Sequence, residues 1–338
     1  MLDSDTNVPD SDSDAPTHVG FLLIPDFALL PYASAIEPLR AANRLSGRRL
    51  YRWSHVSIDG AAAPASNGVA IAADASVGAE LRLDYLFVCA GGNPALFHHQ
   101  PTFAWLRQLA RRGVRIGGVS GGPYLLARAN LLSGYRFTIH WEHAPAFLEE
   151  YPDLDLRRSL YEIDRDRLTC SGGTAPLDMM HALIAREHGS GLALAVSEWF
   201  LQTQVREGTD PQRMKLRERL GIAHEPLLRV IARMEQTLEH PEPRDTLARL
   251  AGVSPRQLER LFRQHLGRSL GEHYLGLRLD RARDLLRQTS LSILETALAC
   301  GFASASHFSR SYSARFGHPP RSERLPVPPV KDRRRVRV

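Results

Sequence analysis

The pattern of apolar residues changes once along this chain of 338 residues, near Glu207. Before that point, short apolar runs typical of buried strands alternate with stretches of helical spacing, which predicts an α/β sandwich around a mostly parallel sheet. Beyond Gly221 the apolar residues follow helical spacing, which predicts an all-α domain. Since a typical domain has ~100–200 residues, two domains of different fold class are expected.

The domain boundaries follow from these patterns and from the composition of the two ends. We expect a disordered acidic tail at residues 1–17, an α/β domain at 18–205, a linker at 206–224, a helical domain at 225–325 and a basic tail at 326–338. In the first domain the spacing predicts strands at 18–24, 51–58, 84–90, 114–120, 159–163 and 168–170, and helices at 31–45, 102–112, 124–132, 143–150, 175–188 and 192–206. In the second it predicts helices at 226–238, 245–251, 255–265, 269–288, 292–300 and 305–316.

The positive charge of the chain lies in its C-terminal third. Residues 225–338 hold 21 Lys and Arg against 12 Asp and Glu, a net charge of +9, whereas the whole chain carries +6. A basic module beside a mildly acidic one indicates contact with nucleic acid, although a basic surface can also be merely solvated.

The helical domain contains a helix-turn-helix pattern. Gly252 suits the tight turn between two helices, Ser254 is a good N-cap, and Pro255 fits the first helical position. The same pattern returns about 47 residues later at Gly301 and Ser304. The helix predicted between the two patterns would separate the recognition helices by about one DNA turn, ~34 Å. The sequence therefore predicts a tandem helix-turn-helix domain; a bundle that uses these glycines for packing alone is the alternative.

This domain resembles the AraC/XylS-type DNA-binding domain over about a hundred residues. The motifs that carry the resemblance are Ala248-x-x-Ala251-Gly252-Val253-Ser254-x-Arg256-Gln257-Leu258-x-Arg260-Leu261-Phe262, Gly267-x-Ser269, Arg278-Leu279-x-x-Ala282, Ala299-Cys300-Gly301-Phe302-x-Ser304-x-Ser306-His307-Phe308-Ser309-Arg310, and Phe316-Gly317-His318-Pro319-Pro320. The outward faces and the resemblance together predict a DNA-binding surface of Ser254, Arg256, Gln257, Glu259, Arg260, Arg263, Ser304, Ala305, Ser306, His307, Ser309 and Arg310.

The first domain contains one candidate catalytic motif, Gly118-x-Ser120-x-Gly122, at a predicted strand-to-helix turn. It matches the G-x-S-x-G nucleophile elbow, in which glycines permit a strained turn. His140 is a candidate base, with Glu142, Asp164 or Asp178 as a candidate orienting acid. A serine-dependent amidase or hydrolase with an attached DNA-binding domain is therefore one interpretation.

A second resemblance weakens that interpretation. Phe21-Leu22-Leu23-Ile24-Pro25-x-Phe27, Glu37-Pro38-Leu39-Arg40-Ala41-Ala42-Asn43, Gly91-Gly92, Leu125-Leu126-Ala127, Thr138-x-His140-Trp141 and Cys170-Ser171-Gly172-Gly173-Thr174-Ala175-x-x-Asp178 resemble the PfpI/class I glutamine amidotransferase-like domain of GlxA-type regulators. Enzymes of that superfamily carry a cysteine at the elbow, where this chain has Ser120. A hydroxyl is a poorer nucleophile than a thiol unless a base activates it, so we expect a ligand pocket rather than catalysis; an inert structural domain is the other alternative.

The predicted pocket suits a small zwitterion. The helix N-terminus after Ser120 favours a carboxylate, while aromatic rings, Tyr32 among them, could face a cationic nitrogen whose charge Glu37 balances; the alternative is that each ring belongs to the core. The resemblance implies control of arginine, carnitine or glycine betaine catabolism. The ligand-binding residues we predict are Phe27, Glu37, Gly91, Gly92, Ser120, Gly121, Tyr124, His140 and Trp141.

Composition excludes several classes of protein. No apolar run is long enough to span a membrane, and three scattered cysteines favour neither disulfides nor a zinc module, so a cytoplasmic protein is expected. His140-x-x-His143 has no third ligand nearby, so we predict no metal and no cofactor. The expected partners are operator DNA, a small-molecule inducer, RNA polymerase and a second copy of the chain, as in a catabolic activator. An architectural nucleic-acid binder without a ligand is the remaining alternative.

Overall fold

The structure is a computed structural model that describes residues 15–323. It divides into two units, Met1–Gln212 and Arg213–Val338. The predicted basic tail and all but the last three residues of the predicted acidic tail lie outside the described residues. In the part of the chain that is described, no helix is long and apolar enough to cross a membrane.

The first unit is built on a seven-stranded sheet in the order β5-β2-β1-β6-β7-β9-β8. All neighbouring strands run parallel except β8, which pairs antiparallel with β9 at one edge. The strands are β1 (Thr17–Leu23), β2 (Tyr51–Ser57), β5 (Ala75–Ser76), β6 (Tyr85–Ala90), β7 (Arg115–Ser120), β8 (Tyr161–Asp164) and β9 (Arg167–Cys170). Sequence spacing missed β5 and the hairpin β3 (Ala63–Pro64) and β4 (Ala70–Ile71), because strands of two residues contain no period.

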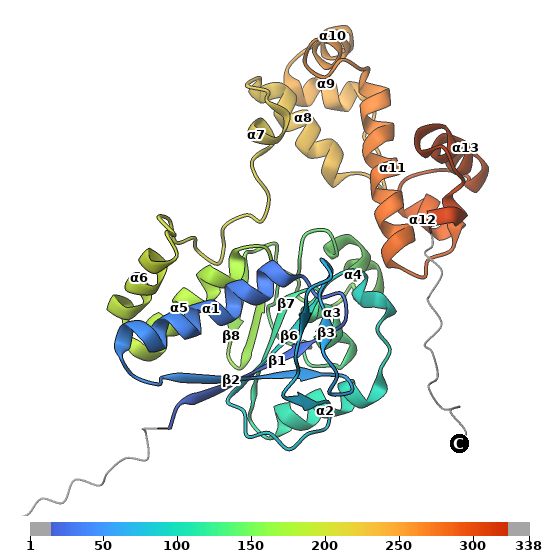
Figure 1. Ribbon diagram of the computed structural model, residues 1–338. Coiled ribbons are helices and arrows are strands. Elements are labelled where there is room, and N and C mark those ends of the chain that lie inside the picture. The colour runs from blue at the N-terminus through green and yellow to red at the C-terminus, as the bar shows by residue number, and fades with distance from the viewer. Residues whose placement is uncertain (1–14, 324–338) are drawn as a thin grey trace, which may run out of the picture. The chain divides into compact units, whose positions relative to one another are not determined.

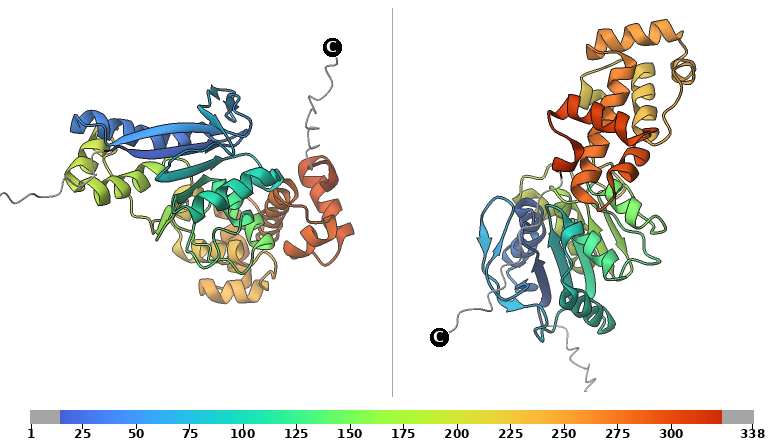
Figure 2. Two further views of the ribbon diagram at one scale, coloured as in Figure 1. Left: turned by 90° about the horizontal axis from the view of Figure 1, so that it is seen from below. Right: turned by 90° about the vertical axis from the view of Figure 1, so that its right-hand side faces the viewer.

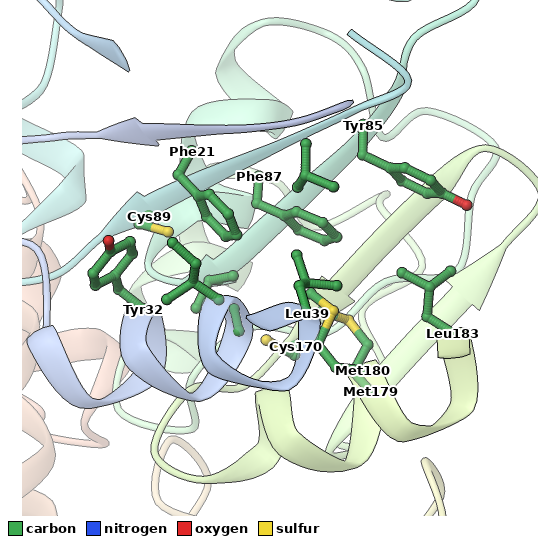
Figure 3. Packing of buried hydrophobic residues seen from close by; sticks show 14 of the residues in the cluster. Phe21, Tyr32, Leu39, Tyr85, Phe87, Cys89, Cys170, Met179, Met180 and Leu183 are labelled. Carbon is green, nitrogen blue, oxygen red and sulfur yellow. The ribbon is translucent and has the colours of Figure 1, made fainter. Parts of the chain in front are cut away.

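Helices cover both faces of this sheet, which confirms the predicted fold class (Figures 1 and 2). One face packs against α1 (Leu29–Ser46), α5 (Ala175–His188) and α6 (Ser190–Trp199); Figure 3 shows Phe21, Phe87 and Cys89 of the sheet facing Leu39 of α1 and Met180 of α5. The other face packs against α2 (Gln100–Arg111), α3 (Gly122–Arg128) and α4 (Ala144–Glu150). A short 3-10 turn, η1 (Pro94–Leu96), follows β6. The central strands are buried on both sides, as continuous apolar runs predict.

The second unit is helical throughout its described part. Its elements are α7 (Leu216–Leu220), α8 (Glu225–Gln236), α9 (Arg244–Ala251), α10 (Pro255–Leu266), α11 (Leu270–Gln288), α12 (Ile293–Ala299), α13 (Ala305–Phe316) and the 3-10 turn η2 (Pro320–Glu323). One core joins α8, α9, α10 and the start of α11 through Leu227, Leu247 and Phe262. A second packs around the rings of Phe302, Phe308 and Tyr312.

The predicted linker at 206–224 does not form a separate segment. Residues up to Gln212 belong to the first unit, where Arg206 pairs with the buried Asp178. Ile222 is buried in the core of the second unit, so residues 213–224 belong there. The predicted helix at 192–206 ends early, at Trp199, because Leu201 takes a left-handed conformation with φ of 56°. Composition predicts a linker here because the segment is polar and contains Gly and Pro. Loops that pack against a domain surface have the same composition, so composition alone cannot separate the two.

The close approach of α3 to β6 requires a glycine. A Cβ atom at Gly122 would lie 2.0 Å from the carbonyl oxygen of Val88. We expect Gly122→Ala to lower the stability of the first unit by at least ~1–3 kcal/mol, the usual cost of overpacking. Thermal unfolding followed by circular dichroism measures this. Gly191→Ala is the matched control, since it adds a methyl group to α6 where no atom lies within 4 Å. Equal unfolding midpoints for the two variants would contradict the conclusion that the approach of α3 to β6 requires a glycine at position 122.

Candidate functional site

The predicted elbow is present at Ser120. β7 ends at this residue and α3 begins at Gly122, so the chain reverses within one residue. Ser120 takes a φ of 59°, a left-handed conformation that non-glycine residues rarely adopt. Gly118 is required as well, because a Cβ there would lie 2.7 Å from the nitrogen of Pro123. The elbow therefore stores backbone strain, as nucleophile elbows do.

Several of the predicted ligand residues meet at the carboxyl ends of β1, β6 and β7. Ala90 at the end of β6 is in register with Ser120, and a Cβ at the next residue, Gly91, would lie 2.6 Å from the carbonyl oxygen of Asp26. The backbone N–H of His140 donates to the carbonyl oxygen of Ser120 at 3.3 Å. The residues brought together in this way are Phe27, Gly91, Gly92, Ser120, Gly121, His140 and Trp141. Ligands of open α/β sheets usually bind at this edge.

His140 is poorly suited to act as a catalytic base. Burial, together with the charge of His143, lowers the pKa of His140 to about 4, although Glu142 opposes the shift. Nδ1 accepts a hydrogen bond from the backbone N–H of Glu142 at 3.4 Å, which leaves the proton of the neutral ring on Nε2. Among the described residues, no hydrogen bond joins the Ser120 hydroxyl to the His140 ring.

Only one of the three candidate orienting acids lies beside His140. The Glu142 carboxylate is 3.8 Å from Nδ1. Asp178 instead binds Arg206, and Asp164 accepts from the backbone of Arg136. The sequence could not separate these acids, because all three are polar residues at plausible distances along the chain. Glu142 is therefore the one candidate acid whose carboxylate faces the His140 ring.

The predicted aromatic cage is wrong for most of its rings. Tyr124 is 1% exposed on the opposite face of the sheet from Tyr32; its hydroxyl donates to Glu150 and its ring lies under the Arg128 guanidinium. Tyr32 is also buried, with its hydroxyl 2.7 Å from Nε2 of His55. Burial raises the pKa of both tyrosines. Each ring satisfies its polar group inside the protein, so neither presents a free face.

Of the remaining rings, Phe27 is fully buried, whereas Trp141 is 42% exposed and lies beside His140 with ring centroids 5.4 Å apart. Glu37 lies two turns along α1, and its carboxylate accepts from Arg40. The N–H of Gly121 donates to the carbonyl oxygen of Ala90 at 3.0 Å. The predicted roles of Glu37 as counter-charge and of Gly121 as carboxylate donor therefore compete with partners inside the protein.

A thiol lies under the elbow, where sequence spacing gave no sign of one. The backbone N–H groups of Ser120 and Gly172 face the sulfur of Cys170, yet burial raises the pKa of this thiol to about 12. Cys89 is likewise buried, and burial raises its pKa. Burial therefore disfavours the thiolate, which is the reactive form of both cysteines.

The first helix-turn-helix is formed as predicted by α9 and α10. Gly252 ends α9 in the left-handed conformation, with φ of 68°, and Ser254 caps α10. The capping is reciprocal: the Ser254 hydroxyl accepts from the N–H of Gln257, and Oε1 of Gln257 accepts from the N–H of Ser254. Some of the hydrogen-bonding groups of these two predicted DNA-binding residues are therefore already used in the cap.

The second helix-turn-helix is formed by α12 and α13. Gly301 has a φ of 73°, and a Cβ there would lie 2.6 Å from the carbonyl oxygen of Leu238. Arg278 of α11 donates to the carbonyl oxygens of Cys300 and Gly301 and lies over the ring of Phe302. The side chain of Ser304 caps α13. A half-buried arginine therefore fixes the turn that precedes the second recognition helix.

All twelve predicted DNA-binding residues are exposed or half-exposed. Their charges are not equally available. Glu259 lies within ion-pair distance of Arg244 and Arg263. Arg256 and Arg260, one helical turn apart on α10, and Arg310 on α13 are exposed and have no ion-pair partner among the described residues. These three arginines are the cations free to meet a phosphate or a base.

Comparison with known proteins agrees with both parts of the chain. Residues 26–186 match the DJ-1/PfpI family, and residues 247–325 match a helix-turn-helix domain. The HTH-type transcriptional regulator GbdR of Pseudomonas aeruginosa is 47% identical over 93% of this chain and 85% of its own length. GlxA of Rhizobium meliloti, also an HTH-type transcriptional regulator, is 46% identical over 93% of this chain and 97% of its own length.

The chain belongs to the family of GlxA-type HTH transcriptional regulators. CdhR of Pseudomonas aeruginosa, 47% identical over 91% of both chains, is another member. A protein of known structure from Vibrio parahaemolyticus has a TM-score of 0.50 and 19% identity over 55% of this chain and all of its own, which shows the fold alone. Both resemblances stated from the sequence, to the amidotransferase-like domain and to the AraC-type domain, are confirmed.

The sequence interpretation missed three contacts near the elbow. Arg206 binds Asp178, and Gln212 binds the carbonyl oxygen of Ile139, both from outside the predicted domain boundary, while Cys170 lies beneath the elbow. No local spacing could have identified them, because each contact joins distant parts of the chain. Within residues 15–323, no cluster of three His, Cys, Asp or Glu side chains could hold a metal ion.

A buried histidine makes the second unit sensitive to acid. His273 is 4% exposed, packs on Phe262, and has no hydrogen-bond partner for either ring nitrogen. Burial, with the charge of Arg268, lowers its pKa from 6.5 to about 4. The unfolded chain therefore binds a proton that the folded unit excludes, and stability is lost as pH falls from 6.5 toward 4.

We expect His273→Phe to flatten this pH dependence. In His273→Phe, the thermal midpoint of the second unit should fall less than in the wild type when the pH is lowered from about 7 to about 5. The same substitution at the exposed His240 is the control. An unchanged pH dependence in His273→Phe would contradict the interpretation.

Proposed function

We propose that this protein is a sequence-specific regulator whose two recognition helices, α10 and α13, bind operator DNA. The observation that carries the proposal is the set of unpaired, exposed arginines on helices that each follow a left-handed glycine turn. Arg256 and Arg260 lie on one face of α10, where each could pair with guanine or phosphate. On α13 the short side chains of Ala305 and Ser306 allow the helix to approach the DNA backbone closely. Arg310 is the cation of this helix that could bind a phosphate.

The test is operator affinity of the full-length protein, with the operator selected from genomic fragments. We expect Arg260→Ala to weaken binding by about tenfold to a hundredfold, since a bidentate contact to a base contributes ~1–3 kcal/mol. Arg229→Ala, which removes an exposed arginine from α8, is the matched control and should change affinity little. Equal affinity of Arg260→Ala and the wild type, or selection of no preferred sequence, would overturn the proposal.

We further propose that the elbow binds a small molecule and does not hydrolyse it. The neutral His140, the absence of its bond to the Ser120 hydroxyl and the buried thiol of Cys170 support this over the serine-hydrolase interpretation. The Ser120 hydroxyl and Nε2–H of His140 can donate to a carboxylate, while the exposed ring of Trp141 can face a cationic nitrogen. A zwitterion of the amino acid, carnitine or betaine class fits these groups and agrees with what the family resemblance implies.

A thermal-shift panel of glycine betaine, carnitine and arginine tests this ligand class. We expect one of these compounds to raise the unfolding midpoint, and Trp141→Ala to reduce that shift by removing the ring face. Trp199→Ala is the matched control, because Trp199 is 45% exposed at the end of α6. Failure of every compound, or an equal shift in Trp141→Ala and the wild type, would reject the zwitterion or its contact with Trp141.

The wider proposal follows from the family. The protein would act in the cytoplasm as a homodimer, with the metabolite as inducer and RNA polymerase as the partner that it activates on catabolic genes.

A further inference from the structure

The segment that leaves α6 and ends the first unit, residues 201–212, is here called the strap (Figure 1). It forms no helix and only an isolated bridge between Pro211 and Ser159. We infer that the strap is the coupling element of this regulator: it is bound by the two loops that meet Ser120, and it leads directly into Arg213, the first residue of the second unit. The inference rests on the elbow being the ligand site proposed above, and it adds how occupancy of that site reaches the rest of the chain.

The strap is first held by Asp178, in the opening turn of α5. This carboxylate is 0% exposed and accepts from Nε2 of Gln202 at 2.7 Å and from Nε and Nη2 of Arg206 at 3.0 and 2.6 Å. The backbone N–H of Arg206 adds a further bond at 2.9 Å, and Nη2 also reaches the hydroxyl of Thr174. Because a buried carboxylate without its partners is very unfavourable, this end of the strap should dock or release as a whole.

The second contact passes through one residue, Leu160, which directly precedes the edge strand β8. The carbonyl oxygen of Gly208 accepts from the N–H of Leu160 at 2.7 Å, and the carbonyl oxygen of Leu160 accepts from the N–H of Ser171 at 2.8 Å. Gly208 can lie this close only because it lacks a side chain: a Cβ would be 2.8 Å from the carbonyl oxygen of Tyr161. The strap is thus one residue away from the loop 171–174 that follows β9.

The third contact is at the last residue of the strap. Nε2 of Gln212 lies within hydrogen-bond distance of the hydroxyl of Thr138 and of the carbonyl oxygens of Ile139 and Ser159, at 3.0, 3.0 and 2.8 Å. Thr138 is fully buried, and His140 follows two residues later. The strap therefore also holds the loop that carries His140 and Trp141.

Both of these loops touch Ser120. His140 donates its N–H to the Ser120 carbonyl oxygen, and a Cβ on Gly172 would lie 2.9 Å from the Cβ of Ser120. A molecule that displaces the Ser120 side chain or the ring of His140 must move one loop or both. Gln212 binds the first loop through Thr138 and Ile139, and Arg206 binds the second through Thr174, so movement of these loops changes how Gln212 and Arg206 are bound.

Hydrogen exchange of the full-length protein, with no ligand and no DNA, tests this coupling from both ends. From the strap, we expect Gln212→Ala to speed exchange by about tenfold in peptides covering loops 138–143 and 171–174, as loss of local stability does. Gln204→Ala is the matched control, because Gln204 is an exposed glutamine of the same strap. Faster exchange confined to the strap in Gln212→Ala would overturn the inference.

From the elbow, Gly172→Ala imitates an occupant by adding a methyl group against Ser120, and it should speed exchange in the strap. Gly173→Ala is its control: Gly173 also has a positive φ, of 59°, but no atom lies within 4 Å of its Cβ position. An unchanged strap in a folded Gly172→Ala protein would contradict the coupling; if that variant does not fold, the Gln212 and Gln204 pair decides alone. A negative ligand panel or operator selection would reject the proposed function without altering either exchange result.

Discussion

The contact of α3 with the backbone of β6 fixes the geometry of the turn between β7 and α3. With no side chain on Gly122, the helix can begin two residues after β7 ends and lie directly against the Val88 carbonyl. The chain can then turn only by placing Ser120 in a left-handed conformation, which costs on the order of 1–3 kcal/mol. Packing of α3 on the buried strands must offset that cost. The close packing of α3 on β6 therefore contributes to the position of Ser120.

The helical unit meets the same geometric problem twice and solves it locally. Each recognition helix follows a glycine in the left-handed conformation and begins at a serine whose hydroxyl accepts from the third residue beyond it. The two helix-turn-helix motifs differ in the residues that surround the turn. Around Gly252 no atom would meet a side chain, whereas Gly301 lies against the carbonyl of Leu238 and is clamped by Arg278. The turn before α13 is thus packed against its own domain, and among the described residues α13 carries one unpaired arginine where α10 carries two.

Fold class and most elements could be predicted because they depend on local patterns. The predicted helices 175–188 and 305–316 agree with α5 and α13 residue for residue, since their apolar spacing and caps lie within a few positions of each other. The elbow and both helix-turn-helix units could be predicted for the same reason.

The environment of the site could not be predicted, because it depends on partners far away in the sequence. Tyr124 was a plausible ring for a ligand until the structure placed its hydroxyl against Glu150. Asp178 has the composition of an orienting acid, yet Arg206, 28 residues later, takes its carboxylate. A polar residue that is satisfied by tertiary contacts and one that is free for a ligand look identical in a single sequence.

The strained elbow carries a serine where nucleophile elbows carry the reacting side chain. A nucleophile elbow exposes its side chain to a base and a substrate, but His140 is neutral far below neutral pH and the nearest thiol is buried. The conformation places the side chain of Ser120 where the loop before α4 meets the loop after β9, against Gly172 on one side and His140 on the other. Strain of this kind is maintained only where the surrounding structure over-determines it. In this protein the surrounding structure includes the strap through Asp178 and Thr138, so the elbow is placed to transmit a change of contact, for which a poorly nucleophilic serine is sufficient.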